Sequence, residues 1–319
     1  MACDDYYSVV ERLYDGEADG IVLNTAYITL LEENELLGDF EEKTRQLTTV
    51  DVAKVVEAPV EIEPMSPFIV YISGKDTWGH ISVTSRSDVN ILAVINPETK
   101  HILLVSTPRD YYVPLSMAGG AMDKLTHAGV YGTEVSEDTL EQLYDVQIDR
   151  YFKVNFSGFE GLINAMGGIT VWSDYAFDVE NIGHFSKGEN QLNGLQALAF
   201  VRERHSFASG DRQRGANQMN VIQSVVQKMC SKNTLLHYSE ILKECDGTFA
   251  SDLTTDEIQQ LVSFQLSNND EWNIEKLSVS GTGAHQHCFS LNNSAYVMIP
   301  NEEDIQNAKN RIQEVLTER

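Results

Sequence analysis

The chain has 319 residues, 42% of them hydrophobic, and a formal net charge of −25 at pH 7. This composition supports a substantial core and excludes a disordered chain, and the length suits two domains or one large domain with an appendage. Surfaces that bind nucleic acid neutralise phosphates with many cations, so 23 basic against 48 acidic residues argue against a nucleic-acid partner.

The first 62 residues predict a small accessory region. A helix-like pattern is followed by apolar residues 21–23, which read as a strand, and by a second helix over residues 26–40. An alternating stretch that ends in prolines places a domain boundary near Glu63. Region 1–62 is short for a domain that folds stably by itself, so we expect a small α/β lobe ahead of a main domain at 63–319.

No run of residues is apolar enough for a membrane helix, and no signal peptide is visible at Met1. The chain enters its first helical pattern almost at once. We therefore expect that a longer native chain has been trimmed, that Met1 was supplied by cloning, and that a native N-terminal anchor is absent from this sequence.

Strands and helices alternate through the main domain. In the first half we expect a buried strand at 67–74, two strands over 90–110 around a turn at 96–99, and a helix over 135–149 with Ser136 as N-cap. A strand, a helix and a second strand follow over 151–172. The second half is predicted to hold a helix over 192–204, a helix capped by Asp211, a strand over 272–283 and a helix over 301–316. Such alternation is typical of an α/β layered domain with helices on both faces of the sheet.

Charged side chains gather where the predicted strands begin or end. They are Asp76, Arg86, Asp88, Arg109 and, further along, Lys124. In open α/β sheets, ligands collect at strand ends and in the adjoining loops. The position of these residues therefore favours a binding site, although any one of them alone is more often a solvated or paired side chain.

An arginine-rich window, FVRERHSFASGDRQRGANQ, occupies residues 200–218. Arg202 and Arg204 end one predicted helix, while Arg214 and Gln218 share a face of the next with Asp211. Arg212 is off that face, and we interpret it as structural or peripheral. Arginine suits bidentate recognition of phosphate, so the window predicts an anionic ligand.

Asp76 and Asp88 have two interpretations. Aspartate is common in turns, but two carboxylates beside an arginine cluster also suit Mg²⁺, which takes one or two carboxylates and completes its shell with substrate phosphates. The second interpretation favours a diphosphate over a monophosphate as ligand.

Several other sites are excluded or left open. The sequence lacks a P-loop and a GxSxG elbow, and its cysteines form no CxxC. His285, His287 and Cys288 lack a defined metal-ligand spacing. Cys230 and Cys245 either close a disulfide or are ordinary buried thiols; the second interpretation is the more common outcome.

Four segments resemble the LytR-CpsA-Psr family of Gram-positive cell-wall enzymes, and its capsule-type members most. They are TSRSDVNILAVINPETKHILLVSTPRDYYV, DKLTHAGVYG, KVNFSGFEGLINAMGGITV and GLQALAFVRERHSFASGDRQRGANQ. The likeness covers roughly residues 66–230 and leaves 1–62 outside the family domain. It implies a three-layer α/β/α sandwich with a central mixed sheet and a hydrophobic lipid groove. Apolar residues in 155–163 and 195–201 would line this groove unless they are plain core.

The resemblance also implies an activity. Family members stand on the extracytoplasmic face of the membrane of a Gram-positive bacterium and transfer an anionic glycopolymer, capsular polysaccharide or wall teichoic acid, from an undecaprenyl-diphosphate carrier to peptidoglycan as a phosphodiester. Several also hydrolyse polyprenyl diphosphate. By this likeness Asp76 and Asp88 bind Mg²⁺ or Mn²⁺, and the diphosphate is bound by Arg86, Arg109, Lys124, Arg202, Arg204, Arg214 and Gln218.

By the same resemblance, Asp88, Arg109, Arg202 and Arg204 carry the catalysis. Two alternatives use the same residues. One is a polyprenyl-diphosphate hydrolase whose acceptor is water, and the other is a non-enzymatic regulator that binds a polyprenyl lipid. The hydrolase differs from the transferase in its acceptor, which is water rather than peptidoglycan. The regulator differs from both enzymes because it shows no metal-dependent turnover. Residue types and spacing alone do not choose among the three.

Overall fold

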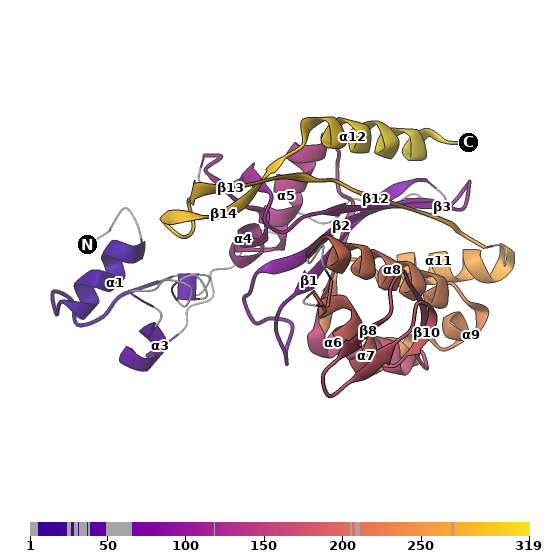
Figure 1. The fold of residues 1–319 in the computed structure, drawn as a ribbon, viewed down its shortest axis with the longest axis horizontal. Coiled ribbons are helices and arrows are strands. Elements are labelled where there is room, and N and C mark those ends of the chain that lie inside the picture. Colours follow the sequence, from indigo (N-terminus) through magenta and orange to yellow (C-terminus); the bar gives the residue numbers. More distant parts are fainter. Residues whose placement is uncertain are drawn as a thin grey trace.

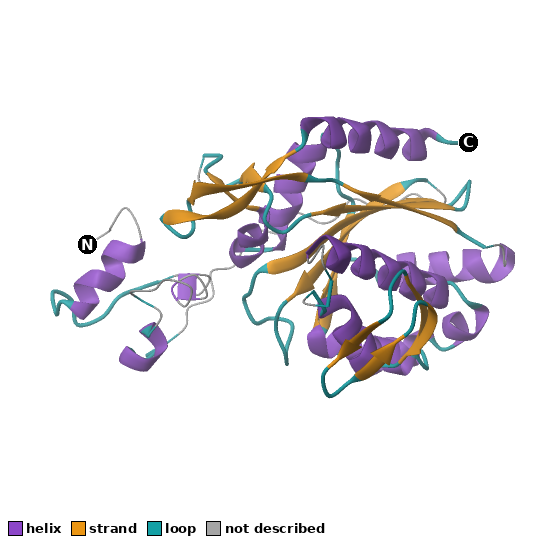
Figure 2. Ribbon diagram, in the orientation of Figure 1, coloured by secondary structure: helices purple, strands orange, loops and turns teal. Residues whose placement is uncertain are grey.

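The protein was analysed as a computed structural model, which describes residues 6–23, 27–28, 31, 37, 39–48, 66–117, 119–204, 206–207, 211–268 and 271–319. The boundary expected near Glu63 lies outside these residues. Figures 1 and 2 show a layered α/β body with a small helical lobe at the N-terminal end.

A mixed six-stranded sheet forms the centre of the body. Its strand order is β11 (Phe249–Ser251), β6 (Arg150–Asn155), β1 (Phe68–Lys75), β2 (Ser87–Asn96), β3 (His101–Thr107) and β12 (Asn273–Ser278). The pairs β1–β2, β2–β3 and β6–β11 are antiparallel, whereas β1–β6 and β3–β12 are parallel. The predicted mixed sheet is therefore confirmed.

Helices cover both faces of the sheet (Figure 1). On one side lie α4 (Leu125–Tyr131), α5 (Thr133–Tyr144) and α12 (Glu302–Thr317); on the other lie α6 (Phe156–Ala165), α7 (Gly194–Arg202), α8 (Asp211–Met229) and α11 (Thr255–Asn268). Ile69 and Tyr71 of β1 face the first group, and Phe68 and Val70 face the second. This alternation follows the period of two of a strand and buries both faces.

The remaining elements are short. They are α1 (Tyr6–Tyr14), α3 (Phe40–Lys43), α9 (Lys232–Leu236), α10 (Tyr238–Glu244) and the antiparallel pairs β4–β5 (Tyr112–Pro114, Met122–Lys124), β7–β10 (Ile169–Ser173, Gly188–Leu192), β8–β9 (Phe177–Val179, Gly183–Phe185) and β13–β14 (Gly281–Cys288, Asn293–Pro300). The N-terminal lobe has its own apolar cluster around Val10 and Phe40.

The lobe contacts the main domain at the β13–β14 turn and at α4. The Tyr7 hydroxyl donates to the carbonyl oxygen of Ser290 at 3.2 Å. The rings of Tyr27 and Tyr131 meet edge to face with centroids 5.9 Å apart, and together they cover the buried side chain of Val130.

Three predictions about local structure are wrong. Ser136 is not an N-cap, because the helix already begins at Thr133 after Gly132 and Ser136 is buried within it. The strand expected over 272–283 is two strands, β12 and the start of β13. Residues 21–23 are irregular rather than a strand, and Val22 is fully exposed, because no neighbouring strand pairs with them among the described residues.

Glu137 on α5 gives the fold a pH dependence. Burial, and then the negative charges of Asp252 and Glu141, raise the pKa of Glu137 from 4.5 to about 8. Between pH 4.5 and 8 the folded state therefore holds a proton that the unfolded state has released, so this residue's contribution to stability falls as pH rises through that window.

Replacing Glu137 by glutamine is expected to raise the melting temperature at pH 8.5 by roughly 2–4 °C, the size of a change of about 1 kcal/mol. The gain should shrink toward pH 5, where the wild-type carboxyl is already neutral. Thermal scans of both proteins at the two pH values provide the check. A gain of equal size at both pH values would show that charge on Glu137 is not its cause.

Candidate active site

The strand register brings several predicted site residues to one edge of the sheet. Lys75, the last residue of β1, pairs with Ser87, and Asn90 of β2 pairs with Thr107, the last residue of β3. Asp76 and Arg109, which follow β1 and β3, therefore lie at the same edge as the start of β2. Arg86 and Asp88 flank Ser87 there, so four of the predicted residues share this edge.

Asp88 and Arg109 form a direct ion pair. Arg109 Nη1 lies 2.9 Å from Asp88 Oδ2, and the Thr126 hydroxyl donates to Asp88 Oδ1 at 3.2 Å. Asp110 extends the network, because Arg109 Nε lies 3.6 Å from Asp110 Oδ2 and Lys124 Nζ lies 3.2 Å from Asp110 Oδ1. The structure thus joins three predicted residues and adds two, Asp110 and Thr126, that sequence reasoning missed.

The start of β2 is fixed by buried polar groups. The Tyr71 hydroxyl donates to Asn90 Oδ1 at 2.7 Å and lies 2.9 Å from Ser87 Oγ. Helix α4 packs closely on this segment, since a Cβ on Gly129 would lie 2.7 Å from the backbone nitrogen and the Cβ of Ser87. Glycine at 129 lets α4 approach closely enough for Thr126 to reach Asp88.

A buried carboxylate anchors the segment that carries Lys124. Asp123, at the centre of β5, accepts hydrogen bonds from the backbone nitrogens of Lys124 and Ser290, each at 2.7 Å, and lies 2.7 Å from His127 Nδ1. Burial alone would raise the pKa of Asp123, but the hydrogen bond and charge of His127 lower it below its ordinary value. An ionised carboxylate here links β5, α4 and the β13–β14 turn.

The arginine window spans the end of α7 and the start of α8. Asn193 and Gln196 form a capping box at the N-terminus of α7, and Arg202 is its last residue. Arg202 and Arg204 are exposed, and Arg214 is half-buried on α8. Gln218 Nε2 donates to the carbonyl oxygen of Val201 at 3.5 Å, which ties α8 to the end of α7.

Side chains of the first α8 residues are only partly described. Asp211 is the first helical residue rather than a described cap, and the side chains of Asp211 and Arg212 lie outside the described part of the chain. Asn217 is fully buried beside Arg214 and Gln218, and its Oδ1 accepts from Gln213 Nε2 at 3.1 Å. Its Nδ2 has no hydrogen-bond partner among the described residues, which marks a polar group that sequence reasoning missed.

Phe156, at the start of α6, connects the window to the loop after β1. The Arg202 guanidinium carbon lies 4.5 Å from the centroid of the Phe156 ring, a cation–π contact. The Trp78 ring meets the same phenylalanine at a centroid distance of 5.4 Å. The structure thereby brings Arg202 to the loop that begins with Asp76.

Lys75 holds the middle of that loop. Its ammonium group donates to the carbonyl oxygens of Ile81, at 3.4 Å, and Val83. Burial, and then the like charge of Lys153, lower the pKa of Lys75 from 10.5 to about 8. The loop between the two predicted metal-binding aspartates is therefore pinned at its centre as well as at its ends.

The two aspartates suit a magnesium ion that is completed by phosphate oxygens. Asp76 is exposed and accepts no hydrogen bond from any described residue, and Asp88 supplies a second carboxylate on the neighbouring strand. No group of three or more His, Cys, Asp or Glu side chains forms a metal cage in the described part of the chain. This donor set resembles Mg²⁺ sites with one or two carboxylates more than a closed all-protein site.

The apolar residues expected along a lipid groove are packed into core. Ile163 of α6 and Ala197 and Phe200 of α7 belong to one buried cluster, with Phe159 and Leu162 against it. A lipid-lining role for this cluster stays a prediction.

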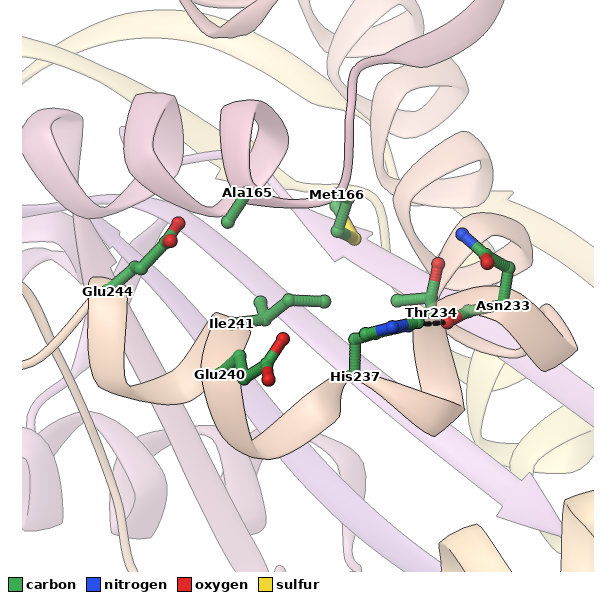
Figure 3. Close-up of a pocket in the computed structure, with 8 residues that line it drawn as sticks. All are labelled: Ala165, Met166, Asn233, Thr234, His237, Glu240, Ile241 and Glu244. Carbon is green, nitrogen blue, oxygen red and sulfur yellow. Dashed lines mark hydrogen bonds between the residues drawn. The ribbon is translucent and has the colours of Figure 1, made fainter.

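A separate cavity of about 280 Å³ lies between the end of α6 and helices α9 and α10 (Figure 3). It is lined by Ala165, Met166, Asn233, Thr234, His237, Glu240, Ile241 and Glu244. None of the predicted site residues lines it, so it is distinct from the strand-edge site.

Cys230, Cys245 and Cys288 are free thiols, so the alternative of a Cys230–Cys245 disulfide is not borne out. Burial raises the pKa of Cys230 to about 11 and that of Cys288 to about 12, which makes both poor nucleophiles. None of the described helices combines the length and apolar character needed to cross a lipid bilayer.

Both a family model and named relatives match this chain over most of its length. The model of the LytR_cpsA_psr family matches residues 32–314. The polyisoprenyl-teichoic acid–peptidoglycan teichoic acid transferase TagU of Enterococcus faecalis is 34% identical over 69% of this chain and 72% of its own length. The Bacillus subtilis protein of the same name is 33% identical over 74% of this chain and 75% of its own.

Solved structures of similar proteins share the fold of this chain. The crystal structure of TagV from B. subtilis covers 80% of this chain and 99% of its own, with a TM-score of 0.67 and 26% identity. The crystal structure of B. subtilis TagU covers 80% of this chain and 98% of its own, with a TM-score of 0.61 and 29% identity. The expected fold is thus shared with known structures across most of the main domain.

Proposed function

The chain belongs to the LytR-CpsA-Psr family of transferases, and we propose that it transfers an anionic glycopolymer from a polyprenyl-diphosphate carrier to peptidoglycan. The observation that carries the proposal is the edge of the sheet where Asp88, Arg109 and Lys124 are joined in one charged network. A cationic and carboxylate-bearing site of this kind suits a diphosphate with a bound divalent cation. The names of the relatives supply the donor and acceptor classes.

We assign diphosphate binding to Arg86, Arg109, Lys124, Arg202, Arg204, Arg214 and Gln218. Their guanidinium, ammonium and amide groups would hold the non-bridging oxygens and stabilise charge that grows on the leaving phosphate. Asp88 has a second role in this scheme, because its ion pair orients Arg109 toward the same edge.

The proposed step is an in-line displacement. An acceptor hydroxyl oxygen attacks the phosphorus that bears the sugar, a new P–O bond forms, and the P–O bond to the prenyl phosphate breaks. The hydroxyl proton passes to a base, and the prenyl phosphate leaves with the bond electrons. An oxygen of Asp76 or Asp88, or a water held by one of them, would accept the proton.

Asp76 and Asp88 would hold Mg²⁺ or Mn²⁺. When bound, such an ion neutralises the phosphate oxygens and lowers the barrier to their displacement. The finer features of the proposal are an undecaprenyl carrier, wall teichoic acid or capsular polysaccharide as the polymer, and a location on the outer face of the membrane of a Gram-positive cell, held there by a native N-terminal anchor.

The test is a transfer assay with a lipid-linked glycan donor and a peptidoglycan oligosaccharide, run with Mg²⁺ and with EDTA. We expect a phosphodiester-linked product that requires the metal and falls at least about 100-fold in EDTA. Free polymer phosphate formed equally well without acceptor would favour a hydrolase. No turnover in either arm, with a polyprenyl lipid retained in mass spectra, would favour a lipid-binding regulator.

A further inference from the structure

Trp78 is an exposed aromatic residue on the loop between Asp76 and Asp88. Its side chain is 54% exposed, although a large apolar ring usually gains from burial. A single exposed tryptophan is unremarkable on a protein surface, but this one stands two residues from a predicted metal ligand. The contacts around Trp78 therefore determine whether a role in ligand binding can be argued for it.

The loop that carries Trp78 is fixed on both sides of the ring. Before it, the Thr77 carbonyl oxygen accepts from the Phe156 backbone nitrogen at 3.0 Å. After it, the Gly79 nitrogen donates to Ser157 Oγ at 3.0 Å, and the Gly79 carbonyl oxygen accepts from Asn155 Nδ2 at 2.8 Å. The ring is thus presented to solvent by a backbone that is already ordered, which lowers the entropy lost on binding.

The partner of Trp78 links it to the predicted diphosphate site. Trp78 and Phe156 meet at an interplanar angle of 64° with centroids 5.4 Å apart, and the Arg202 guanidinium lies 4.5 Å from the same phenylalanine ring. Because the Phe156 ring contacts both Trp78 and Arg202, a group bound over Trp78 would lie near the phosphate that Arg202 is proposed to bind. In the proposed reaction, the groups beside the diphosphate are a prenyl chain on one side and a sugar on the other, with an acceptor sugar entering opposite.

We propose that Trp78 is a sugar-binding platform, whose indole face stacks on a pyranose ring next to the reacting phosphate. This inference rests on the proposed function and names a binding subsite for it. Pyranose rings present C–H faces that pack on aromatic rings, together with hydroxyls that accept hydrogen bonds. Tryptophan offers both an apolar face and a single N–H donor.

The polar surroundings of Trp78 favour a sugar over a prenyl chain. The indole nitrogen donates to no described residue, so it is available to a ligand hydroxyl. Ser157 stands beside the loop, and the exposed His80 Nδ1 and Ser82 Oγ lie 2.8 Å apart a few residues on. A prenyl chain cannot hydrogen-bond to the indole nitrogen or to the remaining hydrogen-bonding capacity of these hydroxyls, whereas the hydroxyls of a sugar can.

The test compares Trp78→Ala and Trp78→Phe with Trp172→Ala. Trp172 is a matched control, since it is also 54% exposed but lies on β7 with its Nε1 bonded to Asp174 Oδ1 at 3.2 Å. Three probes are used: a synthetic polyprenyl-diphosphate disaccharide as donor, a peptidoglycan oligosaccharide as acceptor, and sugar-free geranylgeranyl diphosphate. KM and kcat are measured for each.

We expect Trp78→Ala to raise KM about tenfold for one sugar-bearing probe with kcat within about threefold, and Trp78→Phe to recover most of the loss. The probe affected, donor or acceptor, identifies which sugar the platform binds. Trp172→Ala should match the wild type throughout. An equal rise of KM for geranylgeranyl diphosphate, or no rise for either sugar, would overturn the inference.

A second measurement separates this inference from the proposed function. If the wild type neither transfers nor cleaves, the proposed function fails, and the donor disaccharide and the acceptor oligosaccharide are then each titrated against tryptophan fluorescence. Quenching that Trp172→Ala retains and Trp78→Phe loses would support the platform by itself. Quenching that is equal in both variants, or absent from the wild type, would reject it.

Discussion

Replacing Asp88 by alanine is expected to lower metal-dependent cleavage or transfer at least about 100-fold, equivalent to about 3 kcal/mol on the barrier. The substitution removes one of two proposed metal ligands. It also frees Arg109 from its 2.9 Å ion pair and leaves the Thr126 hydroxyl without its acceptor. Both groups would then be held less firmly where the diphosphate is expected to bind.

The assay is initial rate against Mg²⁺ concentration for the wild type, Asp88→Ala and Asp88→Asn. The asparagine variant keeps an oxygen for Thr126 but lacks the charge, so it separates metal binding from packing. Asp178→Ala is the control, because the Asp178 side chain is 80% exposed and its carboxylate pairs with His184 rather than with a predicted site residue. Wild-type rates in a folded Asp88→Ala protein would refute the assignment, and Arg202→Ala tests the arginine window in the same way.

Replacing Glu257 by alanine is expected to destabilise the fold by about 3–5 kcal/mol. Arg150, at the start of β6, is 2% exposed and pairs with Glu257 of α11, with Arg150 Nε 3.2 Å from Glu257 Oε2. Without the carboxylate, the buried guanidinium would lose its counter-ion, while its hydrogen bond to the Asp149 carbonyl oxygen remains. An uncompensated buried charge is among the most destabilising local defects known.

Urea unfolding of Glu257→Ala and of the double variant Arg150→Met/Glu257→Leu measures this effect. The double variant should recover most of the lost stability, because two apolar side chains of similar length replace both charges. Asp178→Ala again serves as the control, since an exposed pair contributes at most about 1 kcal/mol. A loss below about 1 kcal/mol for Glu257→Ala would show that Arg150 is adequately solvated without its partner.

The central strands could be predicted because their residues are apolar without interruption. The runs at 67–74 and 90–110 became β1, β2 and β3, since strands covered by helices on both faces need no polar side. The β13–β14 hairpin could not be found in this way. Its first strand, GTGAHQHC, is mostly exposed and follows no apolar alternation, so the sequence offered only glycines and histidines there.

Part of the candidate site could not be predicted, because some of its residues are of types that usually have only a structural role. Arginines and aspartates at strand ends could be singled out by charge and position alone. Thr126 and Asp110 could not, because a threonine in a helix and an acidic residue beside an arginine occur everywhere. Phe156 was read as core or lipid lining, and only the folded chain shows that its ring lies between Trp78 and Arg202.

The contact between the N-terminal lobe and the main domain bears on how the protein can be divided for study. Tyr27 and Tyr131 cover Val130, which is otherwise an apolar spot on α4, and Tyr7 reaches the turn whose Ser290 nitrogen binds Asp123. A fragment that begins at residue 66 would expose this surface to water. Because exposed apolar surface favours self-association, we expect such a fragment to associate more readily than a chain that keeps the lobe, so the start chosen for a recombinant fragment affects its behaviour in solution.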